Sequence, residues 1–136
     1  MISKSNFSVH YVKRSSALGG ADVASKAHWI PNTDAYVTDA GMVIKVELAG
    51  VRSENLQIQT EGNQFRISGE RPDSCRASKC NFLVMEISYG PFESVLELPP
   101  GYDLTQAKAA YQNGFLRIDV PLAVHTPPKT TKIAVA

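Results

Sequence analysis

The chain has 136 residues, of which 20% are charged, and its formal net charge at pH 7 is +1. A chain of this length forms one domain with short tails and can bury a core without disulfides or metals. No run of Lys and Arg argues for a nucleic-acid partner, and no apolar run predicts a membrane-spanning helix. Because the N-terminus lacks the apolar core of a secretory signal, we expect a cytoplasmic protein.

Residues 1–28 are expected to form a flexible N-terminal arm. This segment mixes Ser, Ala, Gly and Lys, which bury too little apolar surface to offset the entropy lost on ordering. A plain disordered tail and an adhesive arm that contacts other proteins are both compatible with it. The candidates for such contact are Phe7, Val9, Tyr11 and Leu18.

Between residues 29 and 121 the sequence predicts an all-β fold, an antiparallel β-sandwich of about seven strands. Apolar and polar residues alternate in short segments, and turn residues separate these segments about every ten positions. The clearest segment is 42–48, where the even-numbered residues are apolar and Lys45 and Glu47 lie on the opposite face. The other predicted strands are 34–38, 55–60, 64–71, 92–98, 109–112 and 115–120.

A tight hairpin is predicted around Asn113-Gly114, because both residues tolerate a positive φ and the flanking runs alternate. Pro121 ends the second of these strands, since it cannot donate to a β-ladder. Residues 103–107, which precede the hairpin, are expected to form a loop or a single helical turn.

A long connection occupies residues 72 to about 91, and connections of this length are usually functional or disordered. Its middle, residues 81–86, is apolar enough to form a strand, paired either within the chain or with another chain. Cys75 and Cys80 lie in the same connection, without the Cys-x-x-Cys spacing of redox and zinc motifs. We expect reduced thiols, with a stress-sensitive disulfide as the alternative.

The C-terminal extension, residues 122–136, contains Pro127-Pro128 and is expected to be extended. It ends in Ile133-Ala134-Val135, which places two β-branched side chains on one side of an extended segment. Such a segment suits insertion along the edge of a sheet, with backbone bonds for affinity and two pockets for specificity.

Together these segments resemble the small heat-shock proteins of the α-crystallin family, of the bacterial and plant type. The hairpin carries the family's pattern of Ala109 followed by Asn113-Gly114-Phe115-Leu116. Strands close on Leu48-Ala49-Gly50 and Gly69-Glu70-Arg71, as in the family, and Trp29-Ile30-Pro31 resembles the entry to the domain. The resemblance covers residue 29 to the end of the chain and leaves the arm unmatched.

The resemblance implies an ATP-independent holdase that binds partly unfolded client proteins, prevents their aggregation, and assembles with itself into dimers and larger oligomers. It implies that the connection crosses to a neighbouring subunit and adds its strand there. On this chain Asn81, Phe82, Leu83 and Val84 would pair with Asp34, Ala35, Tyr36 and Val37. It also implies that Ile133 and Val135 dock into a neighbour's groove lined by Leu56, Ile58, Ala109, Tyr111 and Leu116.

One position departs from the family's pattern. The family usually has an Arg shortly before a Tyr-Gly-x-Phe segment; here the segment is Tyr89-Gly90-Pro91-Phe92, and Ile87 occupies the matching position. Any ion pair between subunits that this Arg makes is therefore expected to be absent.

The sequence carries no motif for catalysis, and we expect neither an enzyme nor a cofactor. There is no phosphate-binding Gly-rich loop, no nucleophile elbow, and no metal-ligand spacing among His10, His28 and His125. Two alternatives to the holdase remain: a co-chaperone with a CS-type sandwich, and a β-sandwich binding module without holdase activity.

Overall fold

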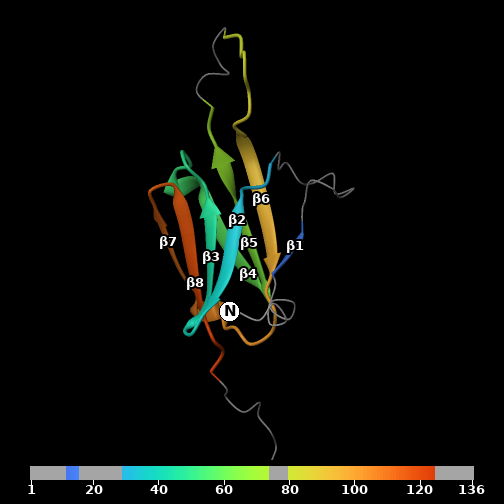
Figure 1. The fold of residues 1–136 in the computed structure, drawn as a ribbon, viewed down its shortest axis with the longest axis vertical. Helices are drawn as coiled ribbons and strands as arrows, with labels where there is room; N and C mark the ends of the chain where they lie inside the picture. Colours follow the sequence, from blue (N-terminus) through green and yellow to red (C-terminus); the bar gives the residue numbers. More distant parts are fainter. Residues whose placement is uncertain (1–11, 16–28, 74–79, 125–136) are drawn as a thin grey trace, which may run out of the picture.

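The computed structural model describes residues 12–15, 29–73 and 80–124. They form two antiparallel sheets with the strand orders β1-β6-β5-β4 and β2-β3-β8-β7, packed as a sandwich (Figure 1). The bounds are β1 Lys13–Ser15, β2 Thr33–Thr38, β3 Gly41–Glu47, β4 Leu56–Glu61, β5 Gln64–Arg71, β6 Gly90–Glu97, β7 Lys108–Gln112 and β8 Phe115–Pro121. The predicted sandwich is confirmed, with seven strands between residues 33 and 121.

The core lies between the sheets and follows the predicted alternation. In and just after β3, Met42 is 2% exposed, and Ile44, Val46 and Leu48 are fully buried. They pack with the inward side chains of the other strands, which are Phe65, Ile67, Phe92, Leu96, Leu98, Leu116, Ile118 and Val120. The period of two therefore identified the inward face of each central strand.

The predicted hairpin between β7 and β8 is confirmed. Asn113 has a φ of 52° and Gly114 a φ of 81°, so both turn residues adopt the left-handed conformation that a type I′ turn requires. The Gly114 carbonyl accepts a hydrogen bond of 2.7 Å from the Leu48 backbone N–H. The turn thereby also holds the end of β3.

Two features were not predicted. Strand β1 is formed by residues of the N-terminal arm and pairs with β6 from Lys13↔Glu97 to Ser15↔Val95. Ser94 lies in phase with Phe92 and Leu96 and is fully buried, and its hydroxyl has no hydrogen-bond partner among the described residues. The alternation of apolar and polar residues assigns polar residues to the outer face of a strand. It therefore cannot identify a serine that points inward.

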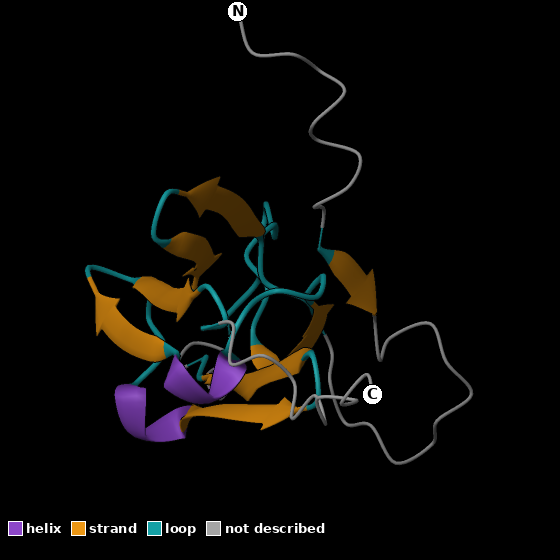
Figure 2. Cartoon of the chain, turned by 90° about the horizontal axis from the view of Figure 1, so that it is seen from below, coloured by secondary structure: helices purple, strands orange, loops and turns teal. Residues whose placement is uncertain are grey.

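Helical structure in the described chain is limited to two 3-10 turns, η2 (Ser53–Asn55) and η3 (Leu104–Gln106) (Figure 2). The η3 turn confirms the single helical turn expected at 103–107. The Asp103 carboxylate caps η3 by accepting a 3.0 Å hydrogen bond from the Thr105 N–H.

The long connection separates β5 from β6 and projects from one end of the sandwich. The pairing of β5 with β6 ends at Arg71↔Gly90. The described residues 80–89, in yellow in Figure 1, extend beyond the strands and contain no strand of their own. The described part of the connection therefore does not extend the β5–β6 hairpin within the chain.

The two sides of the sandwich differ. Trp29 forms an isolated bridge with Phe92 on β6, and the chain reaches β2 four residues later, so β2 lies on the β6 side. The other outermost strands are β4 in the first sheet and β7 in the second. One side of the sandwich therefore presents β2 together with the β6 end of the first sheet.

We expect Gly69→Ala to destabilise the fold. Gly69 lies opposite Phe92 in β5–β6, and a Cβ there would collide with the Asn55 carbonyl oxygen and approach Phe92 Cζ to 2.8 Å. Overpacking of this kind costs about 1–3 kcal/mol of unfolding free energy. Urea unfolding followed by circular dichroism measures it, and Ser68→Ala, next to it on the outer face, is the matched control. Equal stabilities for the two variants would contradict the close approach.

Candidate functional site

The first candidate surface is the free edge of β2. Among the described residues β2 pairs only with β3, so its other backbone edge is open. The four predicted acceptor residues, Asp34, Ala35, Tyr36 and Val37, are all exposed. Ala35 and Val37 lie opposite the buried Ile44 and Met42 and so face inward, yet Val37 is 53% exposed. The sandwich is therefore open along this side, and an unpaired edge can accept another strand.

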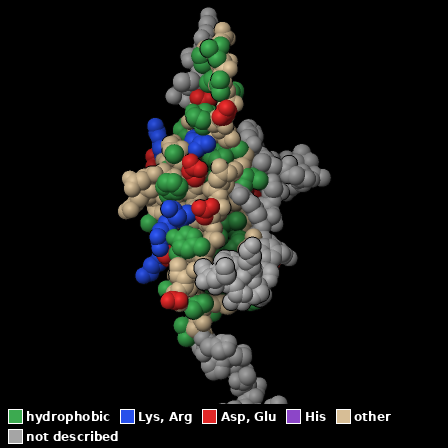
Figure 3. All heavy atoms as spheres, viewed as in Figure 1, with side chains coloured by type: hydrophobic (Ala, Val, Ile, Leu, Met, Phe, Trp, Pro, Cys, Tyr) green, Lys and Arg blue, Asp and Glu red, His purple; other side chains and the backbone are tan. Residues whose placement is uncertain are grey.

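The second candidate surface is the projecting segment, residues 80–89. The predicted donor residues Asn81, Phe82, Leu83 and Val84 lie on it, and all four are exposed. Its exposed large apolar side chains are Phe82 (48%), Leu83 (96%), Val84 (73%), Met85 (55%) and Ile87 (60%). Figure 3 shows hydrophobic side chains gathered on this projection. A concentration of exposed apolar side chains marks a surface that binds another protein.

The third candidate surface consists of the residues predicted to line the side groove, which are Leu56, Ile58, Ala109 and Tyr111 on the outermost strands β4 and β7. Leu56, Ile58 and Tyr111 are partly buried and pack against the core, whereas Ala109 is exposed. Leu116, which was predicted to line the same groove, is only 3% exposed and lies opposite Tyr111 in the β7–β8 pair. Leu116 therefore belongs to the core, and the groove itself stays a prediction.

Tyr111 is anchored to the turn that follows β3. Its hydroxyl oxygen lies 2.6 Å from the Leu48 carbonyl oxygen and 2.7 Å from that of Val51, and it donates its single proton to this pair. Residues 48–51 form that turn, and Val51 itself is buried. The tyrosine thus joins strand β7 to the turn that leads towards β4.

A cluster that the sequence analysis missed lies at the base of the projecting segment. The Arg71 guanidinium lies between the rings of Trp29 and Tyr89, at 4.2 Å and 5.6 Å from their centroids. Its Nε donates to the Ser88 carbonyl oxygen at 2.7 Å. The signals available in the sequence were the single tryptophan and an arginine at the end of a predicted strand, which do not by themselves indicate a contact.

Charged residues on the outer faces form exposed ion pairs. Arg117 and Asp119 on β8 are joined by hydrogen bonds of 3.0 and 3.1 Å. The hydrogen bond from Arg117 lowers the pKa of the Asp119 carboxyl, and the same bond raises the pKa of Arg117. Both side chains are about half exposed, so this pair adds little to stability. On the other sheet, Arg66 pairs with Glu93 at 2.7 Å.

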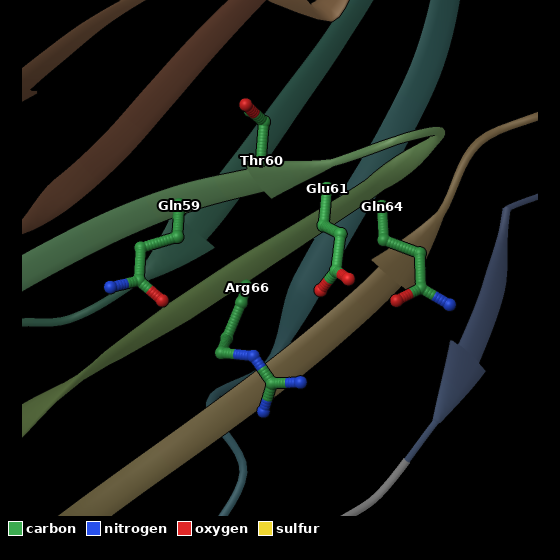
Figure 4. Close-up of a pocket in the computed structure, with 5 residues that line it drawn as sticks. All are labelled: Gln59, Thr60, Glu61, Gln64 and Arg66. Atoms are coloured by element: carbon green, nitrogen blue, oxygen red, sulfur yellow. The ribbon is translucent and has the colours of Figure 1, made fainter.

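Nothing in the described chain is arranged for catalysis. The hollow in Figure 4 is lined by Gln59, Thr60, Glu61, Gln64 and Arg66 at the β4–β5 turn. Its side chains are polar and lie on an open surface, without the buried, convergent groups of an active site. Among residues 12–15, 29–73 and 80–124, no three His, Cys, Asp or Glu residues gather as metal ligands. The helices of that part are all too short to cross a membrane.

Several predicted residues lie outside the described ranges. They are the tail residues Ile133 and Val135, the arm residues Phe7, Val9, Tyr11 and Leu18, and Cys75 of the predicted thiol pair. The docking of the tail, client contact by the arm and the state of the thiols therefore stay predictions.

The described geometry is that of a β-sandwich with surfaces suited to contact with other proteins. It combines an open strand edge, an exposed apolar projection and half-buried apolar side chains on the outermost strands β4 and β7. The model of the Hsp20/alpha crystallin family matches residues 34–136, so the chain belongs to this family. Its members act as ATP-independent, non-enzymatic chaperones that typically form oligomers and bind client proteins.

Relatives of similar sequence include bacterial and plant proteins. The chain is 29% identical over 98 residues to the small heat shock protein C2 of Rickettsia felis, which covers 72% of this chain and 64% of that protein. It is 29% identical over 121 residues to the 16.9 kDa class I heat shock protein 1 of wheat, Triticum aestivum, covering 88% and 80%. The chain thus spans slightly less than two thirds of the Rickettsia protein.

Solved structures share the fold. A small heat-shock protein from Xylella fastidiosa superposes with a TM-score of 0.68 at 26% identity, covering 81% of this chain and 99% of the other. The hspA protein from Xanthomonas axonopodis gives a TM-score of 0.65 at 28% identity, covering 71% and 96%.

We expect Tyr111→Phe to lower the free energy of unfolding by about 1–3 kcal/mol, since the Val51 carbonyl loses its donor and the Leu48 carbonyl keeps only the Val51 N–H. Thermal and urea unfolding followed by circular dichroism measure this change. The matched control is Tyr102→Phe, at a partly buried tyrosine outside the proposed interfaces, which should stay within about 0.5 kcal/mol of the parent. Equal stabilities of the two variants would show that the hydroxyl contacts do not hold the turn.

Proposed function

We propose that this chain is an ATP-independent holdase, which binds partly unfolded proteins and keeps them from aggregating. The observation that carries the proposal is the set of apolar side chains exposed on residues 80–89, in a chain of the Hsp20/alpha crystallin family. Such a surface competes with client–client association by mass action, because apolar area buried against the chaperone is no longer available for aggregation. The cycle requires no nucleotide.

The proposed unit is a dimer formed by strand exchange. Residues 81–84 of one subunit would add to the open edge of β2 at residues 34–37 of the other, and the reverse contact would complete a two-fold interface. Two features support this arrangement: the open edge of β2, and the absence of any strand among the described residues 80–89. Pairing would satisfy the exposed backbone groups and bury part of Leu83 and Val84.

The proposed larger assembly links dimers through the tail. Ile133 and Val135 would insert into the side groove of a neighbouring subunit, beside the half-buried Leu56 and Ile58. Each buried Ile or Val contributes about 1.5–3 kcal/mol, so one tail alone binds reversibly and many tails together bind firmly. The solved relative from Xylella fastidiosa is described as forming a distinct high order structure.

Two further parts of the proposal concern the arm and the location. Phe7, Val9, Tyr11 and Leu18 of the arm would add apolar contacts to clients, and the chain would act in the cytoplasm. Cross-linking of a bound client through a photoreactive residue at position 7 or 11 tests the contribution of the arm.

The holdase activity is tested by heating an unrelated model protein with a near-stoichiometric amount of the purified chain and no nucleotide. We expect light scattering to be suppressed and the client to be recovered in a soluble complex of high mass. An equal mass of serum albumin is the control for non-specific protection. Undiminished scattering at every temperature below unfolding of the chain would contradict the holdase and favour a co-chaperone with a dedicated partner.

The tail contact predicts that Ile133→Gly with Val135→Gly reduces the assembly to dimers while the sandwich stays folded. The reason is that glycine removes the two side chains that fill the groove and leaves the core untouched. Light scattering coupled to size exclusion measures the mass, and circular dichroism checks the fold. The matched control is Thr130→Gly with Thr131→Gly in the same tail, which should keep the parent mass. An unchanged mass for the Ile133 and Val135 variant would contradict docking of the tail.

A further inference from the structure

Arg71, the last residue of β5, is held between two aromatic rings. Its Cζ atom lies 4.2 Å from the centroid of the Trp29 ring and 5.6 Å from that of Tyr89. A guanidinium over an aromatic face is attracted by the negative charge of the ring face, and more strongly where water is excluded. The stack fixes the plane of the guanidinium and therefore the directions of its N–H groups.

Those N–H groups connect two other segments of the chain. Nε donates to the Ser88 carbonyl oxygen at 2.7 Å, and Nη1 donates to the Ala49 carbonyl oxygen at 3.1 Å. Ser88 belongs to the projecting segment, whereas Ala49 lies in the turn after β3. One side chain thus joins the returning limb of the projecting segment to the body of the sandwich.

Trp29 is itself anchored where the projecting segment rejoins the sandwich. Its Nε1–H donates to the Gly90 carbonyl oxygen at 2.9 Å, and its ring packs against Phe92 with centroids 5.1 Å apart. Trp29 is 8% exposed and lies four residues before the start of β2. The Arg71 cluster, defined as Trp29, Arg71 and Tyr89, therefore contacts both the base of the projecting segment and the approach to β2.

We propose that Arg71 is a positioning residue for strand exchange: it sets the direction in which residues 80–89 leave the sandwich relative to β2. This inference rests on the proposed dimer. The described residues of the segment make no strand pairing in the single chain, so contacts at its base determine where its apolar residues reach. A small rotation at Ser88 would move residues 81–84 by several ångströms, since they lie at the far end of an extended segment.

Ile87 precedes Ser88 in the projecting segment, and its side chain is 60% exposed. This side chain supplies neither a charge nor a hydrogen-bond donor to the junction. Arg71 supplies both from the end of β5, through its bond to the Ser88 carbonyl.

The decisive substitution is Arg71→Lys, because lysine keeps the positive charge but not the planar fork that stacks and donates in two directions at once. Arg71→Ala removes the charge as well. The matched controls are Arg66→Lys and Arg66→Ala on the same strand, where the arginine makes an outward ion pair with Glu93. Val84→Pro tests the strand exchange itself, since it breaks no β-ladder that the described residues form within one chain.

Each full-length variant is compared in two ways at a temperature well below unfolding. Native mass spectrometry of a dilution series gives the concentration at which monomer appears, and acrylamide quenching of Trp29, the only tryptophan, reports the cluster directly. We expect Arg71→Lys and Arg71→Ala to raise the monomer-appearance concentration at least about tenfold, equivalent to about 1.4 kcal/mol, and to increase quenching. The Arg66 variants should change neither quantity.

The outcomes separate this inference from the dimer model. If Val84→Pro weakens the dimer and the Arg71 variants do not, the dimer model stands and the positioning role is wrong, even where quenching increases. If neither weakens the dimer, strand exchange and the positioning role are both wrong. If the Arg71 and Arg66 variants weaken the dimer equally, general loss of charge on β5 is responsible and the positioning role is wrong.

Discussion

An open β-sandwich has outermost strands whose backbone N–H and C=O groups are not all satisfied by their own sheet, and the functional surfaces of this chain follow from that constraint. On one sheet the free edge of β6 is partly covered by the three residues of β1 and by the bridge from Trp29. On the other sheet β2 has no such cover among the described residues. The free edge of β2 lies on the same side of the molecule as the partly covered edge of β6.

The two sides of the sandwich favour different kinds of partner. Along β2 the free groups belong to the backbone, so recognition there depends on an extended segment more than on its side chains. Along β4 and β7 the half-buried Leu56, Ile58 and Tyr111 offer apolar surface, so recognition there would depend on the shape of the inserted side chains. Each proposed contact would be weak by itself and firm only when repeated across an assembly.

The Arg71 cluster connects the projecting segment and the approach to β2 to the body of the sandwich. Its members come from the approach to β2, the end of β5 and the start of β6, so it forms only when the β5–β6 hairpin is complete. The Tyr111 hydroxyl plays a comparable part on the other side, joining β7 to the turn after β3. In both cases a side chain donates hydrogen bonds to backbone carbonyl oxygens of connecting segments, which form no β-ladder of their own.

The sequence by itself determined the strands, their inward faces and the turn at Asn113-Gly114, because these depend on local alternation and on residues that tolerate a positive φ. It also identified β2, whereas the strand predicted within residues 81–86 is not formed in the single chain. Only the tertiary structure decided that Leu116 lies in the core, that residues of the arm cover part of β6, and that Arg71 reaches Trp29, Ser88 and Ala49. Those outcomes depend on how strands far apart in the chain are placed against one another, and neither alternation nor turn chemistry carries that information.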